Sequence, residues 1–455
     1  MDSDNKSFVR GRWQALFLVQ ALTFVYHFSN TNLQPIQSPI LNEFGLTLEE
    51  FNLLYSITDI PSLIIPFFAP ALINRIHTSG LLLLATLTIN FGQLLTALAA
   101  QLHSYNLMLV ARVCMGIFQE TQLVAAQLAL HKWFSLNEYA FAISFQPLMN
   151  GGSKIINSYF MPHVYEVCQS ITATLYWSFL LGTFSAICAI AYYFYEKRKI
   201  PILRSLSEDT ESSENIWGQI KEFKFVLWVT YALHLLFSAA YYSFNTVIFH
   251  YIMVKYGYTG IESGNLVILH YVATVLAAPV VGKISSMLNW RGYFFLAAAL
   301  DFVGCFVYIM FFPSENNLIN AVVLLVLLGV FWALVSAPIY PIFSELSTKD
   351  GQNTVYAFAS VVQSVGIVIF PLLAGKYNDS IEGNNIQYRA YDDFLFIIGL
   401  TQLGICLIWA MLFRKYKGEK ERPTSFEELP LLHADSLKKQ PITAIESRHS
   451  LPEQL

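Results

Sequence analysis

Long apolar stretches separated by short polar turns recur along the whole chain. Residues 80–102 and 318–343 each reach the roughly 20 residues with which a helix crosses about 30 Å of hydrocarbon. Apolar runs of this length exceed what a buried helix of a soluble domain needs. The pattern therefore predicts an all-α membrane protein.

The apolar stretches number about twelve and form two sets of six. We expect the membrane helices to begin near Trp13, Phe51, Gly80, Asn106, Tyr139 and Ile171, and then near Lys224, Ser263, Gly292, Leu318, Gln352 and Asp393. Residues 196–223 are rich in serine and glutamate, a composition typical of a solvated linker. The expected segments are a cytosolic N-terminus (1–12), a six-helix half (13–195), a cytosolic linker (196–223), a second six-helix half (224–413) and a cytosolic tail (414–455).

Composition agrees with a lipid environment, because only 13% of the residues are charged and a soluble domain carries roughly 25%. The net charge of −4 suggests no nucleic-acid partner. The five cysteines show no paired spacing, so we expect neither a disulfide framework nor a metal site, and no motif indicates a cofactor. The first apolar stretch is full length and lacks a small-residue cleavage pattern, so we expect it to stay as a membrane helix.

Lysine and arginine test this arrangement, because they collect on the cytosolic side of short loops. Counted from a cytosolic N-terminus, most of them fall on one side: Arg10, Arg12, Arg75, Lys132, residues 197–199, Lys221, Lys283, Arg291, Lys349, Arg414, Lys415 and Lys417. The other side holds Lys255, Lys376 and Arg389. The alternation predicts that both termini face the cytosol. Six spans, a linker and six more spans are typical of transporters built from two parallel repeats, with a site near the midplane between them.

Helix-breaking residues interrupt three of the expected spans. They are Pro61, Pro66 and Pro70 in the second span, Gly151 and Gly152 in the fifth, and Pro338 and Pro341 in the tenth. A break in a membrane helix needs a partner helix or a water-filled cavity to satisfy the freed backbone groups. Packing or kinking explains such residues more often than contact with a substrate, although both fit a protein that rocks between two states.

Glu120 is the strongest candidate for a functional residue. A charged side chain costs about 2.5 to 3.5 kcal/mol at the centre of a membrane helix, so it usually lines a cavity or has a partner. Spacings of four place Arg112, Gly116 and Glu120 on one helical face, with Glu120 roughly 20 Å from the non-cytosolic end. A carboxylate there suits an amino group or a proton. The alternative is a structural pair with a neighbouring helix.

Lys154 is the matching cation. From the expected boundaries it lies about 12 Å below the non-cytosolic end, and its depth differs from that of Glu120 by about 9 Å. Its ammonium group either reaches the cavity or extends to water along its flexible stem. Further candidates for substrate contact are Arg112, Asn150, Asn30 and Asp59 in the first half, and Tyr242, Asn245, Tyr340 and Gln363 in the second.

Other aromatic and histidine residues are better explained by structure. Tyr241 and Trp332 belong to a large aromatic population that is mostly interfacial belt or helix packing. Histidines can relay protons because imidazole titrates near neutral pH, but isolated ones are more often structural. The apolar stretches contain His27, His234, His250 and His270.

The tail carries one short signal. Glu427 lies four residues ahead of the Leu431-Leu432 pair, which matches the acidic dileucine pattern that sorting adaptors read. The signal predicts a lysosomal or vacuolar destination.

Two stretches, 112–157 and 338–379, resemble the lysosomal dipeptide transporter branch of the major facilitator superfamily. The first keeps Arg112, Gly116, Glu120, Gln127 and Trp133-Phe134, and the second keeps Tyr356, Phe358, Gln363-Ser364, Gly366 and Ala374-Gly375. The loop motif of the superfamily survives as Asn74-Arg75. Weaker similarity covers nearly all of the expected spans.

The resemblance implies a uniporter that moves dipeptides out of the lysosome, with Glu120 holding the amino end of the peptide. It also implies a heavily glycosylated accessory membrane protein as partner. The fifth-helix arginine of the family is absent, because its position holds Gly151 or Asn150. Either Lys154, one turn away, replaces it, or the substrate differs.

Three functions remain open from the sequence. The first is a transporter of small zwitterionic peptides or amino acids with Glu120 and Lys154 at opposite ends of the substrate. The second is a proton-coupled organic-anion or sugar porter that uses Arg112 and Lys154. The third is a receptor or scaffold that has lost transport, which the cost of the buried charges argues against. We expect no enzyme, since no nucleophile, metal cluster or phosphate loop is found.

Overall fold

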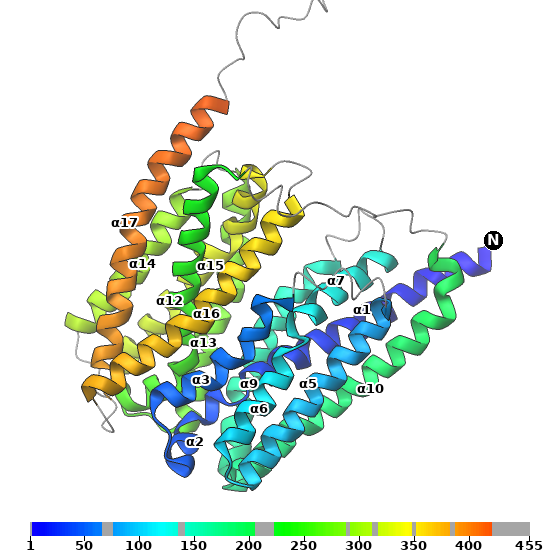
Figure 1. Ribbon diagram of the computed structural model, residues 1–455, viewed down its shortest axis with the longest axis horizontal. Helices are drawn as coiled ribbons and strands as arrows, with labels where there is room; N and C mark the ends of the chain where they lie inside the picture. The colour runs from blue at the N-terminus through cyan, green and yellow to red at the C-terminus, as the bar shows by residue number, and fades with distance from the viewer. Residues whose placement is uncertain are drawn as a thin grey trace, which may run out of the picture. The chain divides into compact units, whose positions relative to one another are not determined.

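The computed structural model of the 455-residue chain describes residues 2–65, 76–134, 142–204, 223–287, 292–311, 317–347, 352–382 and 387–420. All regular secondary structure in these ranges is helical (Figure 1). The chain forms one compact unit over Met1–Ala410 and a second over Met411–Leu455, of which the last turns of one helix are described. The predicted all-α fold is confirmed.

Ten helical segments are described in the first half. They are α1 (Asp2–Thr31), η1 (Gln34–Ile36), α2 (Gln37–Phe44), α3 (Leu48–Asp59), η2 (Ile60–Leu63), α5 (Thr78–Gln101), α6 (Tyr105–Gly116), α7 (Gln119–Trp133), α9 (Phe145–Cys168) and α10 (Ile171–Arg204). The helix α10 continues into the region expected to be the linker, of which residues 205–222 lie outside the described residues.

Six long helices are described in the second half. They are α12 (Phe225–Tyr256), α13 (Gly260–Met287), α14 (Gly292–Phe311), α15 (Leu318–Leu346), α16 (Gln352–Glu382) and α17 (Arg389–Lys420). Each begins within a few residues of an expected start, so the apolar pattern locates these helices well.

Within the described residues, nine helices are long and apolar enough to cross a membrane. One of the nine combines α6 and α7. Three expected spans, represented by α1, α3 and α9, are not among the nine. The short helix α3 stops at Asp59, and α9 carries polar side chains through its middle. The chain is a multi-pass membrane protein, and the total of twelve spans stays a prediction.

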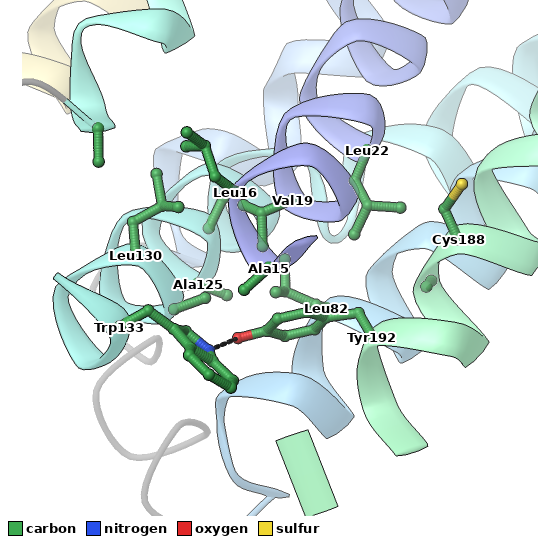
Figure 2. Close-up of a cluster of buried hydrophobic side chains, with 14 of the residues drawn as sticks. Ala15, Leu16, Val19, Leu22, Leu82, Ala125, Leu130, Trp133, Cys188 and Tyr192 are labelled. Carbon is green, nitrogen blue, oxygen red and sulfur yellow. Dashed lines mark hydrogen bonds between the residues drawn. The ribbon is translucent and has the colours of Figure 1, made fainter. Parts of the chain in front are cut away.

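One core cluster of the first half joins α1, α5, α7 and α10 (Figure 2). Small side chains such as Ala15 and Ala125 let the helices approach, and Leu16 and Leu82 fill the space between them. The indole N–H of Trp133 donates to the Tyr192 hydroxyl at 3.2 Å, so the cluster also satisfies its buried polar atoms. Such internal pairing is required where no water reaches the helices.

Two helix breaks of the first half lie against each other. The helix α3 ends at Asp59 and continues as the 3₁₀ turn η2, which contains Pro61, and the turn at Ile117 and Phe118 separates α6 from α7. A Cβ atom on Gly116 would lie 1.8 Å from the carbonyl oxygen of Thr58. Only glycine permits this approach, so Gly116 fixes the contact between α3 and α6.

The other predicted breaks have different outcomes. The helix α9 passes through Gly151 and Gly152 without interruption, and α15 passes through Pro338 and Pro341. Neighbouring helices let a membrane helix tolerate such residues. Pro66, Pro70 and the Asn74-Arg75 loop motif lie outside the described residues, as do Lys221, Arg291, Lys349 and the Glu427, Leu431, Leu432 signal.

Most of the contact between the halves comes from two helix pairs, α3 with α16 and α9 with α13, and α12 adds contacts with η1, α2 and α3. The Asn52 side-chain amide donates to the carbonyl oxygen of Pro371 at 2.8 Å. A Cβ atom on Gly264 would lie 2.4 Å from the carbonyl oxygen of Ser158, which shows how closely α13 approaches α9. We call the end of the molecule where α3 and α13 begin, and α9 and α16 end, the sealed end.

We predict that Gly116→Ala destabilises the protein. The added methyl group meets the α3 backbone, and such overpacking costs about 1–3 kcal/mol. A thermal unfolding assay in detergent should show a lower apparent melting temperature. Gly152→Ala is the matched control, because nothing lies within 4 Å of its Cβ position, and it should leave stability unchanged or slightly raised. Equal stability of the two variants would contradict the contact at Gly116.

Candidate central binding site

Lys154 of α9 extends from the first half toward the second. Its Nζ atom lies 5.6 Å from the ring centre of Tyr271 on α13 and 5.9 Å from that of Tyr241 on α12. Lys154 therefore lies where helices of both halves meet.

Tyr241 and Tyr271 face this lysine from the second half, and together with Tyr242 and Trp332, which pack on Tyr241, they form what we call the aromatic wall. Tyr241 and Trp332 stack with ring centres 4.0 Å apart, and Tyr242 meets Trp332 edge to face at 5.6 Å. A cation over aromatic rings gains about 0.5 to 2 kcal/mol, more as water is excluded. The aromatic wall therefore offsets part of the cost of bringing the ammonium group inside.

Two predicted residues orient the aromatic wall. The Tyr271 hydroxyl donates to Asn245 Oδ1 at 3.0 Å, and the side-chain amide of Gln363 donates to the Tyr242 hydroxyl at 3.2 Å. Asn245 and Gln363 thus hold tyrosines in place from α12 and α16. Their role as candidates for substrate contact stays a prediction.

The ammonium group of Lys154 and the side-chain oxygen of Asn150 can each bind a ligand. Among the side chains that the structure describes, no carboxylate forms an ion pair with Lys154. One turn earlier on α9, the buried Oδ1 atom of Asn150 accepts no hydrogen bond within the described part of the chain. Because unpaired polar groups are costly away from water, a ligand that supplies an anion and a donor is stabilised here.

Glu120 is the second residue of α7, directly after the break at Ile117 and Phe118, and its side chain lies outside the described residues. From Tyr105 to Glu120 a helix rises about 22 Å, and from Lys154 to Cys168 about 21 Å. The helix α9 extends farther toward Cys168 than the sequence suggests. Measured from the helix ends at Tyr105 and Cys168, Glu120 and Lys154 therefore lie at similar distances, whereas the expected boundaries put them about 9 Å apart.

Arg112 is fully buried and already engaged by its own half. Its guanidinium group donates to the backbone carbonyl of Asn30 at 3.4 Å and to Asn32 Oδ1 at 3.2 Å, and lies 5.1 Å from the Tyr55 ring centre. Asn32 in turn donates to Gln93 and Ser178, each at 2.9 Å. These contacts tie α6 to the end of α1.

The remaining predicted residues lie in separate surroundings. The Gln119 side-chain amide donates to the carboxylate of Asp59, which joins the start of α7 to the end of α3. Asn30 contributes its backbone oxygen to Arg112, and its side chain is half-buried. Tyr340 is 45% exposed and meets Tyr356 edge to face at 5.7 Å.

The surroundings of Gly151 explain why the cation of α9 is at Lys154 rather than at position 151. A Cβ atom on Gly151 would lie 2.3 Å from a methyl group of Val275 on α13. An arginine at this position therefore requires displacement of Val275, whereas Lys154 already reaches the aromatic wall one turn away.

Sequence reasoning missed Tyr241 and Tyr271 as neighbours of Lys154. Aromatic residues and histidines in an apolar stretch look alike whether they pack against lipid or line a site.

The chain matches the sequence profile of the Major Facilitator Superfamily over residues 21–371. It is 22% identical over 407 residues to the lysosomal dipeptide transporter MFSD1 of Danio rerio, covering 87% of this chain and 86% of that protein. The Homo sapiens protein of the same name is 22% identical over 381 residues, covering 81% of this chain and 80% of that protein.

Solved structures with the same fold include two transporters. The nucleoside transporter NupG has a TM-score of 0.70 at 10% identity and covers 89% of this chain and 99% of its own. An inward-facing, unoccupied bacterial homologue of the human lysosomal transporter Spinster has a TM-score of 0.68 at 13% identity, with 89% and 96% coverage. The expected major facilitator fold is confirmed.

We predict that Arg112→Lys lowers stability without weakening ligand binding by the folded protein. A lysine cannot reproduce the planar fork that reaches both Asn30 and Asn32, and a hydrogen bond to a charged group contributes about 1.5–3 kcal/mol. Thermal unfolding measures the first effect and ligand titration the second. Arg389→Lys, at an exposed position, is the control. Normal stability combined with lost affinity would instead assign Arg112 to the ligand.

Proposed function

The chain belongs to the Major Facilitator Superfamily, and from this premise we propose that it is a uniporter that exports dipeptides, or single amino acids, from the lysosome or vacuole to the cytosol. The family and the similar proteins are transporters, so the chain is a membrane transporter of small molecules rather than an enzyme. The relatives named as lysosomal dipeptide transporters support the proposed substrate class and compartment.

The environment of Lys154 is the observation that carries the proposal. Its ammonium group lies over Tyr241 and Tyr271 and forms no ion pair with the described carboxylates. The carboxylate of a peptide or amino acid supplies the missing anion. Lys154 thus takes the role that the family gives to a fifth-helix arginine, from a position one turn along the same helix.

The two ends of a zwitterionic substrate then have separate partners. In the proposal, Glu120 holds the amino group, Asn150 Oδ1 accepts an N–H of the ligand, and the aromatic wall packs against its side chains. Because Glu120 and Lys154 lie at nearly the same depth, the substrate lies roughly in the plane of the membrane. Similar depths do not distinguish a dipeptide from one amino acid, so the choice of a dipeptide rests on the relatives and on the size of the aromatic wall.

Transport follows from the two-halved fold. A site between the halves becomes accessible from one side and then the other as one half rocks against its partner. Lys154 and the aromatic wall come from different halves, so a bound substrate connects the two. Release of the substrate requires that its contacts with one of the two halves weaken as the halves separate.

The proposal also includes the cellular destination of the protein and its protein partners. With both termini in the cytosol, the Glu427, Leu431, Leu432 signal is available to sorting adaptors. A glycosylated accessory membrane protein is proposed from the family resemblance. The alternative of an organic-anion or sugar porter needs Arg112 as an anion site, and the engagement of Arg112 with Asn30 and Asn32 argues against it. A receptor or scaffold without transport would not need a buried cation that, among the described side chains, has no carboxylate partner.

We predict that Lys154→Gln and Glu120→Gln each nearly abolish dipeptide uptake by the reconstituted protein. Both changes keep the size of the side chain and remove its charge, and a lost charge-assisted hydrogen bond lowers affinity about 10- to 100-fold. Uptake of labelled dipeptide into proteoliposomes measures the effect. Lys376→Gln, at an exposed position on α16, is the control and should transport normally. Unchanged uptake by the first two variants would refute the assigned roles.

We also predict that dipeptides, and less strongly amino acids, raise the melting temperature of the purified protein. A ligand that binds only the folded state at 100 times its Kd adds about 2.7 kcal/mol of stability. The panel includes sugars, nucleosides and organic anions as controls. Stabilisation by one of these classes, with no response to peptides, would replace the proposed substrate.

A further inference from the structure

Asp379, near the end of α16, binds the start of a helix that belongs to the other half. Its carboxylate accepts hydrogen bonds from the backbone N–H groups of Leu48 at 3.3 Å and Glu49 at 2.8 Å. These groups open the first turn of α3. The contact therefore joins the two halves at the sealed end.

The start of α3 depends on this carboxylate from the second half. Within its own half, Thr47 and Glu50 form a capping box that satisfies their own N–H groups. The N–H groups of Leu48 and Glu49 lie between them and have no partner in the helix. Asp379 accepts from these two groups and places a negative charge at the positive end of the helix dipole.

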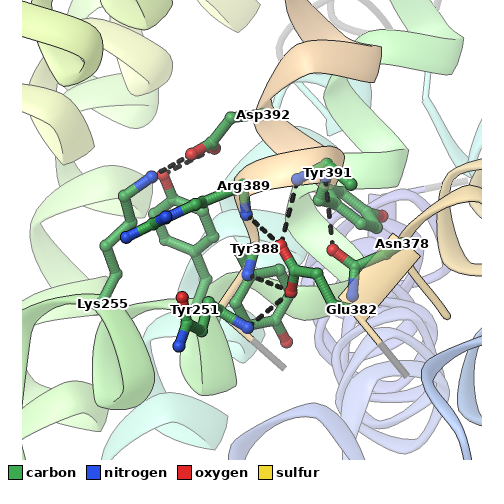
Figure 3. Close-up of polar contacts among 10 residues, drawn as sticks. Tyr251, Lys255, Asn378, Glu382, Tyr388, Arg389, Tyr391 and Asp392 are labelled. Atoms are coloured by element: carbon green, nitrogen blue, oxygen red, sulfur yellow. Dashed lines mark hydrogen bonds and ion pairs between the residues drawn. The ribbon is translucent and has the colours of Figure 1, made fainter. Parts of the chain in front are cut away.

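Asn378 and Glu382, which flank Asp379 along α16, bind the start of α17 (Figure 3). On one side of Asp379, Asn378 Oδ1 accepts from the backbone N–H of Tyr391 at 3.3 Å. On the other, the Glu382 carboxylate accepts from the four backbone N–H groups of residues 387–390, at 2.6 to 3.1 Å. Both contacts fix the end of α16 to the start of α17.

The contacts of α17 extend to α12. Asp392 of α17 forms an ion pair with Lys255 and accepts a hydrogen bond from the Tyr251 hydroxyl at 2.8 Å. These contacts join α12, α16 and α17 to one another. The helix α16 carries the Asp379 carboxylate that contacts α3.

The helices α3 and α16 also pack closely beside Asp379. One turn earlier on α16, a Cβ atom on Gly375 would lie 2.9 Å from the Cα atom of Glu49 and 2.9 Å from the side-chain nitrogen of Asn52. Asn52 donates to the Pro371 carbonyl oxygen one turn earlier still. The seam between α3 and α16 is therefore closed by backbone contact, and Asp379 lies at its outer edge.

We propose that Asp379 is a gate residue, whose contact with the start of α3 sets the equilibrium between the state closed at the sealed end and the state open there. Opening separates α3 from α16, so Leu48 and Glu49 exchange the Asp379 carboxylate for water and lose a favourable charge at the helix start. The contact stabilises the closed state only. Removing it shifts the protein toward opening, whichever substrate the central site binds.

The test measures the distance across the sealed end in the full-length protein in nanodiscs. Fluorophores carried by unnatural amino acids at Leu102, which is 67% exposed, and at Glu262, which is also exposed, report on the first and second halves. Asp379→Ala should increase the ratio of long-distance to short-distance states about five- to thirty-fold. Asp379→Asn, which keeps one acceptor oxygen, should give a smaller increase.

Asp393→Asn is the matched control, because it removes an exposed negative charge from the same end without touching α3. It should leave the distance distribution unchanged. Asn52→Ala removes a second contact of the seam and should shift the distribution in the same direction as Asp379→Ala.

Wild-type distance distributions in both Asp379 variants would overturn the proposal, and so would an equal shift in Asp393→Asn. If Asp379→Ala does not yield monodisperse protein, the isosteric Asp379→Asn decides alone. No substrate enters the measurement, so its failure is distinguishable from a failure of the dipeptide proposal.

Discussion

The structure depends on one constraint: a polar group inside a membrane helix must find its partner within the protein or in a ligand. Arg112 satisfies it through Asn30 and Asn32, and Asp59 satisfies it through Gln119. Lys154 differs, because its contacts in the described part of the chain are aromatic rings rather than a carboxylate. We take this difference to separate a residue that holds helices together from one that holds a substrate.

The same constraint governs how the halves meet. Where α3 starts, two backbone N–H groups that its own capping box leaves free are satisfied by Asp379 from the other half. At the centre, the charge on the first half lies against rings of the second. In the two proposals, substrate binding and gating follow the same principle, since in each a polar group of one half is paired with a group outside that half.

Much of the fold was predictable from the sequence, because membrane helices follow directly from apolar runs, and Pro61 marked the end of α3. The break between α6 and α7 was not, because Gly116 ends α6 where α3 approaches, a contact between distant segments. The end of α9 at Cys168 was not predictable either, because the polar middle of this helix conceals where it ends. Gly375 belongs to a family pattern in the sequence, but the reason for it, backbone contact with Glu49, follows only from the two halves together.

The most direct test of the central claim pairs a change in the protein with a change in the ligand. Binding of a dipeptide and of its C-terminal amide is measured for the wild type and for Lys154→Gln. If Lys154 holds the substrate carboxylate, amidation weakens binding to the wild type and has little effect on the variant, with a coupling energy of about 1.5–3 kcal/mol. Equal effects of amidation on both proteins, a coupling energy near zero, would contradict the account.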